Sequence, residues 1–214
     1  YRWSGYTDRF HGQPDLLQIL RSGGRRKKRQ IYDYLDNHPY AIRPANYPSD
    51  APGDGWCIAD CNGWRILVIN LLGTTFMDSM DSPFKTVDRI LEQNRGKYDI
   101  SVVDIHAEAT SEKIALARYL DGRVSGIFGT HTHVPTADEQ ILPKGSGYIT
   151  DVGMCGCEES ALGVEVENVI SKFRTKMPTR FKLASGKITL SGVLFSFDNN
   201  LRLVSVERIK ESYL

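Results

Sequence analysis

The chain has 214 residues, a formal net charge of +1 and 41% hydrophobic residues, which is the composition of an ordinary globular domain. A charge this close to zero gives no global field that would attract nucleic acid or an anionic membrane, so we expect neither as a partner. No apolar run approaches the roughly 20 residues that a membrane-spanning helix needs, and no signal peptide is visible. We therefore expect a cytoplasmic location. Because the sequence opens with Tyr1 rather than Met, we also expect a processed or incomplete chain.

The first third of the chain carries weak structural signals. Residues 1–12 show neither helical nor strand periodicity, whereas Pro14–Leu20 has leucines at helical spacing and ends before a Gly-Gly pair. Five consecutive basic residues, Arg25–Arg29, are open to two interpretations, a nucleic-acid-binding patch or a solvated linker. The linker is favoured because no aromatic residue interrupts the run. A short helix is predicted over Gln30–Asp36, and residues 43–55 are rich in loop-forming residues.

The middle of the chain alternates between predicted strands and predicted helices. Apolar runs predict strands at Ile66–Leu72, Ile100–Ile105 and Val124–Phe128. Between them, apolar residues at helical spacing predict helices from Ser82 to about Asn94 and from Thr110 to Leu120. This alternation implies right-handed crossovers and a sheet of neighbouring parallel strands.

The last third has a different pattern, richer in β-structure. A strand is predicted over Tyr148–Val152 and a helix over Val164–Phe173. Three β segments follow, separated by turn residues, at Arg180–Ala184, Lys187–Phe197 and Leu201–Ile209. A meander that packs on a second sheet fits this pattern best.

Three histidines directly follow two of the predicted parallel strands. His106 comes after Ile100–Ile105, and His131 and His133 come shortly after Val124–Phe128. Ligands of open α/β sheets gather outside the carboxyl ends of the strands, and imidazole suits first-row metal ions. Side chains two apart on an extended segment point the same way. We therefore predict a metal site at which all three histidines converge, with their nearest ring nitrogens within roughly 5 Å of one another.

Several longer motifs occur in a fixed order between about Gln30 and Leu214. They are I-R-P-A-N-Y-P from Ile42, I-N-L from Ile69, H-A-E-A-T-S-E-K from His106, G-T-H-T-H-V from Gly129, I-L-P-K-G from Ile141 and Y-I-T-D-V-G-M from Tyr148. In sequence and in spacing they resemble the YmdB-like bacterial metallophosphoesterases, a family similar to the calcineurin-like phosphoesterases.

This resemblance implies a fold and a chemistry. The fold would be α/β, a four-layer α/β/β/α metallophosphoesterase sandwich. The function would be hydrolysis of cyclic nucleotide phosphodiesters such as 2′,3′-cAMP by metal-activated hydroxide. Family members bind two divalent ions such as iron or manganese, and the family's histidine ligands correspond here to His106, His131 and His133. The expected partner is a small cyclic nucleotide or phosphoester, and a homo-oligomer is compatible with the family.

The N-terminal metal-binding motifs of that family have no counterpart here. They are G-D-[IV]-[VI]-G, N-G-E-N and G-N-H-x-W, which supply an Asp, a bridging Glu, Asn ligands and the general-acid His. No catalytic residue is therefore assigned, and one bound ion rather than two is expected. We divide the chain into a divergent segment, residues 1–29, and a metallophosphoesterase domain, residues 30–214. The divergent segment should leave a neighbouring strand as an open sheet edge. The alternative to an active enzyme is a catalytically impaired, metal-binding remnant of the family.

Five further polar residues are candidates for supporting the ligands or contacting the substrate. Glu108 lies in the first histidine motif and could hydrogen-bond a ligand imidazole. Thr130 and Thr132 flank His131 and are expected to orient its loop. Asn46 and Arg43 lie in the I-R-P-A-N-Y-P motif and are expected to approach the phosphate.

Overall fold

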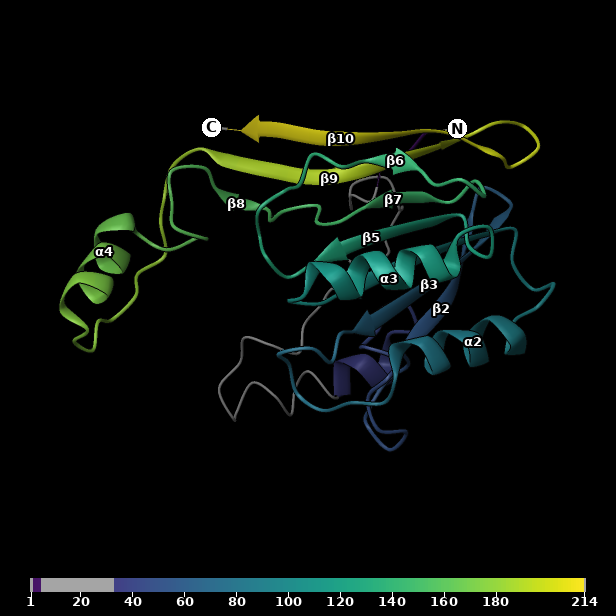
Figure 1. Cartoon of the computed structure of the whole chain (residues 1–214), viewed down its shortest axis with the longest axis horizontal. Coiled ribbons are helices and arrows are strands. Elements are labelled where there is room, and N and C mark those ends of the chain that lie inside the picture. The colour runs from purple at the N-terminus through teal and green to yellow at the C-terminus, as the bar shows by residue number, and fades with distance from the viewer. Residues whose placement is uncertain (1, 5–32, 214) are drawn as a thin grey trace.

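The computed structural model describes residues 2–4 and 33–213, which form two β-sheets facing each other (Figure 1). The larger sheet has six strands among these residues, in the spatial order β2-β3-β4-β5-β7-β6. In the smaller sheet β9 lies between β1 and β10, and β8 also pairs with β9. The bounds are β1 Arg2–Ser4, β2 Trp56–Cys61, β3 Trp64–Leu72, β4 Ile100–His106, β5 Gly126–Thr130, β6 Gln140–Ile141, β7 Gly147–Ile149, β8 Gly156–Cys157, β9 Ile188–Phe197 and β10 Leu203–Tyr213.

The alternation of strands and helices in the middle of the chain produces the parallel centre of the larger sheet. Strands β3, β4 and β5 are parallel neighbours, as predicted. Helix α2 (Pro83–Gln93) connects the first pair and α3 (Thr110–Leu120) connects the second. Pro83 suits the first turn of α2 because a first-turn N–H has no partner within the helix.

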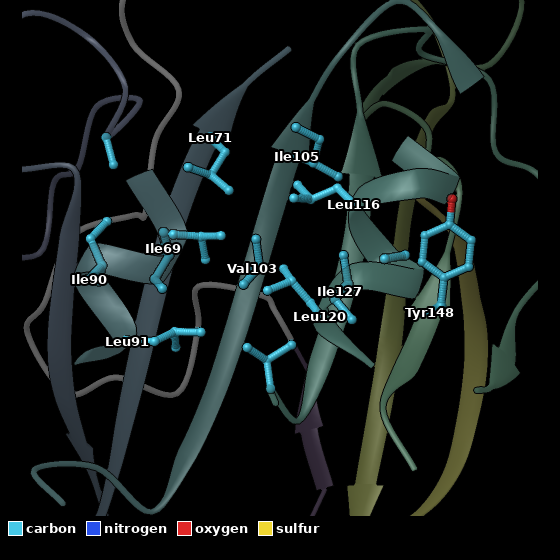
Figure 2. Packing of buried hydrophobic residues seen from close by; sticks show 14 of the residues in the cluster. Ile69, Leu71, Ile90, Leu91, Val103, Ile105, Leu116, Leu120, Ile127 and Tyr148 are labelled. Carbon is cyan, nitrogen blue, oxygen red and sulfur yellow. The ribbon is translucent and has the colours of Figure 1, made fainter. Parts of the chain in front are cut away.

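The two faces of the larger sheet belong to two separate hydrophobic cores. Odd-numbered residues of β3 and β4 pack against α2 and α3, as Figure 2 shows for Ile69, Val103 and Ile105 beside Ile90 and Leu116. Even-numbered residues of the same strands pack in the other cluster, against Val193 and Phe195 of β9. Side chains alternate across a strand, so one apolar run supplies both cores. Each fully buried aliphatic side chain contributes about 1.5–3 kcal/mol to the stability of this arrangement.

The structure corrects the sequence prediction at both ends of the chain. Arg180–Ala184 is not a strand, because Leu183 makes only an isolated bridge to Val164. Arg2–Ser4, where no strand was predicted, pairs with Leu194–Ser196 of β9, so this part of the sheet edge is covered rather than open. The predicted helix at 14–20, the basic run 25–29 and residues 30–32 of the next predicted helix lie outside the described residues, and residues 33–37 are helical.

Strand β2, which was not predicted from the sequence, forms a hairpin with β3. The two strands are antiparallel, and the turn between them is Asn62-Gly63 with φ values of 54° and 87°. Positive φ at both turn residues is what a two-residue type I′ hairpin needs, and Asn-Gly is its strongest sequence signal. The signal was therefore present in the sequence.

Helix α4 (Val166–Thr175) lies beyond the end of the smaller sheet rather than against it (Figure 1). The structure describes every residue of α4, and none of them is buried. Its C-terminal neighbour Lys176 has left-handed backbone angles and ends the helix. No helix in the described part of the chain has both the length and the apolar character that crossing a membrane requires.

Candidate active site

Polar side chains gather at the carboxyl ends of β3, β4 and β5. In the parallel register Asn70 lies opposite Asp104, and His106 lies opposite Thr130. Asn70, Asp104 and His106 are even-numbered, like the residues of β3 and β4 that face the smaller sheet. Their side chains therefore lie on the same face of the larger sheet, beyond the end of the apolar core. All three are buried, with exposed fractions of 4%, 9% and 8%.

A directed chain of hydrogen bonds fixes the orientation of His106. Asn70 Nδ2 donates to Asp104 Oδ2 at 2.8 Å, and Thr130 Oγ1 donates to Asp104 Oδ1 at 2.9 Å. The Thr130 hydroxyl has one hydrogen, so it must accept at its 3.0 Å contact with His106 Nδ1. The hydrogen-bond geometry therefore assigns the Nδ1–H tautomer to neutral His106 and leaves its Nε2 with a lone pair.

His131 meets His106 on that lone-pair side. His131 Nδ1 lies 3.0 Å from His106 Nε2, and the two rings are perpendicular with centroids 4.8 Å apart. His131 Nε2 lies 2.7 Å from Glu108 Oε2. The predicted convergence of these two histidines is confirmed, and Glu108 makes the predicted contact with an imidazole.

The structure does not group His133 with the pair to hold an ion, in contrast to the predicted convergence of all three histidines, which are all among the described residues. Its side chain is exposed. The segment is not extended as predicted, because His131 and His133 both have positive φ, 112° and 67°. Positive φ turns the chain at both residues, so side chains two apart no longer share a direction. Such backbone angles in non-glycine residues cost about 1–3 kcal/mol each and concentrate at functional sites.

A buried ion pair holds the histidine-bearing loop in this shape. Lys113 Nζ lies 2.8 Å from Asp151 Oδ2, and both side chains have an exposed fraction of 0%. The same carboxylate accepts hydrogen bonds from the Thr132 N–H at 3.0 Å and the Gly153 N–H at 2.9 Å. Gly129 is required nearby, because a Cβ there would lie 1.8 Å from the Thr150 carbonyl oxygen. The backbone N–H of Thr132 thus ties the loop to Asp151, whereas the hydroxyl of Thr130 contacts Asp104 and His106.

Asn46 and Arg43 make their hydrogen bonds to backbone groups, those of Asn46 including Leu72, which lies opposite His106 in the sheet; their expected approach to a phosphate stays a prediction. Asn46 exchanges two hydrogen bonds with the backbone of Leu72 and donates a third to the Asp81 carbonyl. Arg43 donates to the carbonyls of three loop residues, Pro44, Ala51 and Pro52. Burial lowers the pKa of Arg43, against the opposing effect of Asp54. Both side chains therefore stabilise the loop before β2 and the end of β3.

Sequence reasoning assigned no role to three residues that organise the site, Asn70, Asp104 and Lys113. Asn70 and Asp104 are polar residues within otherwise apolar strand runs. Burying a polar side chain is costly unless it is hydrogen-bonded, so a polar residue at such a position signals a specific partner. Lys113 gave no comparable signal, because a lysine in a helix is usually exposed.

The His106–His131 pair fits part of a metal coordination sphere. Two nitrogens each about 2.1 Å from one ion and at a right angle to each other would be about 3.0 Å apart. The observed separation is 3.0 Å, and the tautomer of His106 directs the Nε2 lone pair at His131. Across residues 2–4 and 33–213, however, no three His, Cys, Asp or Glu side chains are grouped to hold an ion. The described residues therefore offer a partial ligand set.

Comparison with known proteins gives a consistent set of similarities. Residues 24–209 match the model of a family described as YmdB-like protein. The chain is 47% identical over 183 residues to the 2′,3′-cyclic-nucleotide 2′-phosphodiesterase of Bacillus subtilis, covering 85% of this chain and 69% of that protein.

Two solved structures are also similar to this chain. A hypothetical protein from Thermus thermophilus superposes with a TM-score of 0.79 at 43% identity, covering 86% of this chain and 71% of that one. A novel phosphatase from Mycoplasma pneumoniae superposes with a TM-score of 0.78 at 36% identity, covering 87% and 68%. The chain thus spans about seven-tenths of the length of these proteins.

Proposed function

Because this chain belongs to the YmdB-like protein family, we propose that it is a metal-dependent phosphodiesterase domain that hydrolyses a cyclic nucleotide such as 2′,3′-cAMP. The observation that carries the proposal is the pairing of His106 Nε2 with His131 Nδ1 at 3.0 Å, at the carboxyl ends of adjacent parallel strands. The similar Bacillus subtilis protein is named for this activity, and the similar Mycoplasma pneumoniae structure is named a phosphatase.

In this proposal His106 and His131 hold one divalent ion, and His133 is a further ligand that would have to turn inward. A divalent ion at a phosphoryl group neutralises charge on the phosphoryl oxygens and lowers the pKa of water. The protein's own contribution is to keep the ligand nitrogens in place. Asp104 and Thr130 fix the tautomer of His106, and Glu108 holds the far nitrogen of His131.

The alternative function is that of a catalytically impaired, metal-binding member of the family. It is favoured by the donor set, because the described residues bring two imidazoles together without grouping three His, Cys, Asp or Glu side chains that could hold an ion. Loss of a general acid alone typically lowers a rate about 10²–10⁴-fold. We therefore expect one weakly bound ion per chain and slow turnover.

The test is manganese content by elemental analysis together with turnover of 2′,3′-cAMP, with His106→Ala as the reference for a disabled site. One ion and slow turnover, both lost in His106→Ala, support the proposal. One ion with no turnover supports the impaired alternative. Two tightly bound ions with fast turnover would show that groups outside the described residues complete a dinuclear centre, and turnover unchanged in His106→Ala would refute this site.

A further inference from the structure

The segment after the start of α4 carries a concentration of positive charge that the net charge of the chain conceals. We call residues 168–187 the basic arm. It contains six cationic residues and no acidic one, namely Lys172, Arg174, Lys176, Arg180, Lys182 and Lys187. The net charge of the chain is only +1, so the remaining residues carry a compensating excess of acidic groups.

The basic arm is also unusually exposed for a segment with so many apolar residues. Residues 170–178 are exposed without interruption. The large apolar side chains within the arm include Phe173 at 67%, Met177 at 64% and Leu183 at 86% exposure. A charged face that merely keeps a protein in solution has no need of exposed aromatic rings, so this combination marks a binding surface.

Most of the cations in the arm form no ion pair with a carboxylate of the described residues. Lys182 and Lys187 pair with Glu165 and Glu158, at 4.0 and 3.1 Å. In the described part of the chain no ion pair is formed by the other four, Lys172, Arg174, Lys176 and Arg180. Two of these instead lie over exposed aromatic rings, Lys172 at 4.6 Å from the centre of the Phe181 ring and Lys176 at 5.6 Å from that of Phe173.

We propose that the basic arm binds single-stranded RNA. Cations placed beside aromatic faces suit a single strand, whose phosphates pair with Lys and Arg while its bases stack on the rings. An amphipathic membrane anchor would instead keep its cations on the face opposite its aromatic residues. The local positive charge of the arm is complementary to a polyanion. This local charge supports nucleic-acid binding although the net charge of the whole chain does not predict it.

The position of the arm relates this surface to the candidate active site. In Figure 1 the arrowheads of β3 and β5 point toward the end of the molecule from which α4 projects. The histidine pair lies at the carboxyl ends of β4 and β5, so the arm and the site are at the same end. A 2′,3′-cyclic phosphate can form only on a ribose with a 2′-hydroxyl, so it can terminate an RNA strand. Resting on the proposed function, the inference is that the substrate class includes RNA strands whose 3′ end is a cyclic phosphate.

The binding experiment measures the affinity of the whole chain for a fluorescein-labelled, unstructured oligoribonucleotide of about 12 nucleotides. Fluorescence anisotropy reports binding at salt concentrations between about 50 and 200 mM. The arm variant is Lys172→Gln/Lys176→Gln/Arg180→Gln. The matched control removes three exposed cations elsewhere, Lys85→Gln/Arg89→Gln/Lys97→Gln. Each lost phosphate contact lowers the slope of log K against log salt by about 0.7, so we expect a slope smaller by about two in the arm variant alone.

A second variant, Phe173→Leu/Phe181→Leu, should weaken binding about tenfold with little change in slope.

Other outcomes would overturn the inference. These are no RNA binding by the parent chain, equal loss in the arm variant and the control, or an arm that instead binds phosphatidylglycerol vesicles or drives self-association in sedimentation. All substituted residues are exposed, so the variants should keep the parent's unfolding temperature.

Turnover separates this inference from the proposed function. The arm variant should have a higher KM for an oligoribonucleotide ending in a 2′,3′-cyclic phosphate and an unchanged KM for 2′,3′-cAMP. RNA binding through the arm without any turnover would refute the proposed function but retain the arm as an RNA-binding surface. Turnover of 2′,3′-cAMP without RNA binding would refute the arm as an RNA-binding surface but retain the proposed function.

Discussion

At the scale of single residues, the hydroxyl of Thr130 determines what His106 can do. It lies between a carboxylate, which can only accept, and an imidazole nitrogen, which must therefore donate. This arrangement leaves Nε2 of His106 as an acceptor directed at His131. A metal-ligating histidine usually has a partner of this kind on its other nitrogen.

Replacing Thr130 by Val should therefore weaken manganese binding about 10–100-fold, because the ring of His106 would lose its tautomeric and rotational constraint. Isothermal titration of the apoprotein with manganese measures this directly. Thr130→Ser keeps the hydroxyl and therefore the hydrogen bond to His106. Its manganese affinity should stay within about twofold of the parent's, because a loss of more than about 10-fold is expected only when that hydrogen bond is removed. Equal affinities in the Val and Ser variants would show that the hydroxyl does not position His106.

Asp138 is a second residue whose effect can be measured, here through pH. Burial by itself raises the pKa of Asp138, but hydrogen bonds from Thr136 and Thr150 outweigh it and hold the pKa below the usual 3.8. A carboxyl with a lowered folded-state pKa stabilises the fold above its unfolded-state pKa, and this contribution is lost as the pH falls through the folded-state value.

The difference in urea midpoint between the parent and Asp138→Asn should therefore be largest near neutral pH and should close as the pH falls below 3.8. Urea titrations at a series of pH values check this. Asp50→Asn, at an exposed loop position, controls for the loss of a surface charge. A difference that stays constant down to the lowest pH would contradict the assigned role of the Asp138 carboxylate.

At the scale of elements, one buried ion pair connects helix α3 to the loops that follow β5 and β7. Lys113 is on α3, and Asp151 accepts from the backbones of Thr132 and Gly153. The pair is fully buried, so each charge depends on the other for its solvation. This dependence ties the backbone of the positive-φ loop around His131 to a buried ion pair, although the loop itself lies at the surface.

Lys113→Met should lower the free energy of unfolding by about 3–5 kcal/mol, because it leaves the Asp151 carboxylate buried without its cation. Urea unfolding measures the loss. The exposed Lys144→Met has the same change of side chain and should stay within about 0.5 kcal/mol of the parent. A Lys113→Met protein as stable as the Lys144→Met protein would mean that the pair does not stabilise the loop.

At the scale of the whole molecule, a two-sheet body carries one exposed extension. The larger sheet of the body lies between two hydrophobic cores, whereas no residue of α4, which is described in full, is buried. Segments with few buried contacts open at low free-energy cost and are the preferred sites of proteolysis. The basic arm should therefore behave as a separate unit.

Limited trypsin digestion should make its first cut within residues 33–213 after one of the basic residues between 172 and 182. Mass spectrometry of the fragments locates the cut. The basic residues of α2 and α3 provide the internal comparison, because these helices pack on the core. First cuts in α2 or α3 would mean that the arm is held more firmly than its exposure indicates. Protection of the arm by single-stranded RNA would agree with the proposed partner.

Local patterns in the sequence predicted the central fold and the meeting of His106 with His131. The strand–helix alternation from residue 66 to 130 was predicted because apolar periodicity is a property of neighbouring residues. The meeting of His106 and His131 was predicted because parallel strands bring their carboxyl ends to one edge. The family was indicated by motifs that are themselves short and local, and the match over residues 24–209 confirms it.

The tertiary structure alone decided the features that depend on residues far apart in the chain. His133 was misplaced because positive φ in its loop is maintained by Asp151 and Lys113, which are 38 residues apart. The roles of Asn46 and Arg43 depend on which backbone carbonyls lie beside them after folding. Arg180–Ala184 has the composition of a strand, but within residues 2–4 and 33–213 its β-pairing is limited to the bridge between Leu183 and Val164. A strand needs a neighbouring strand, and a ligand needs the other groups of its site. For these residues such partners come from distant parts of the folded chain, so the local sequence does not reveal them.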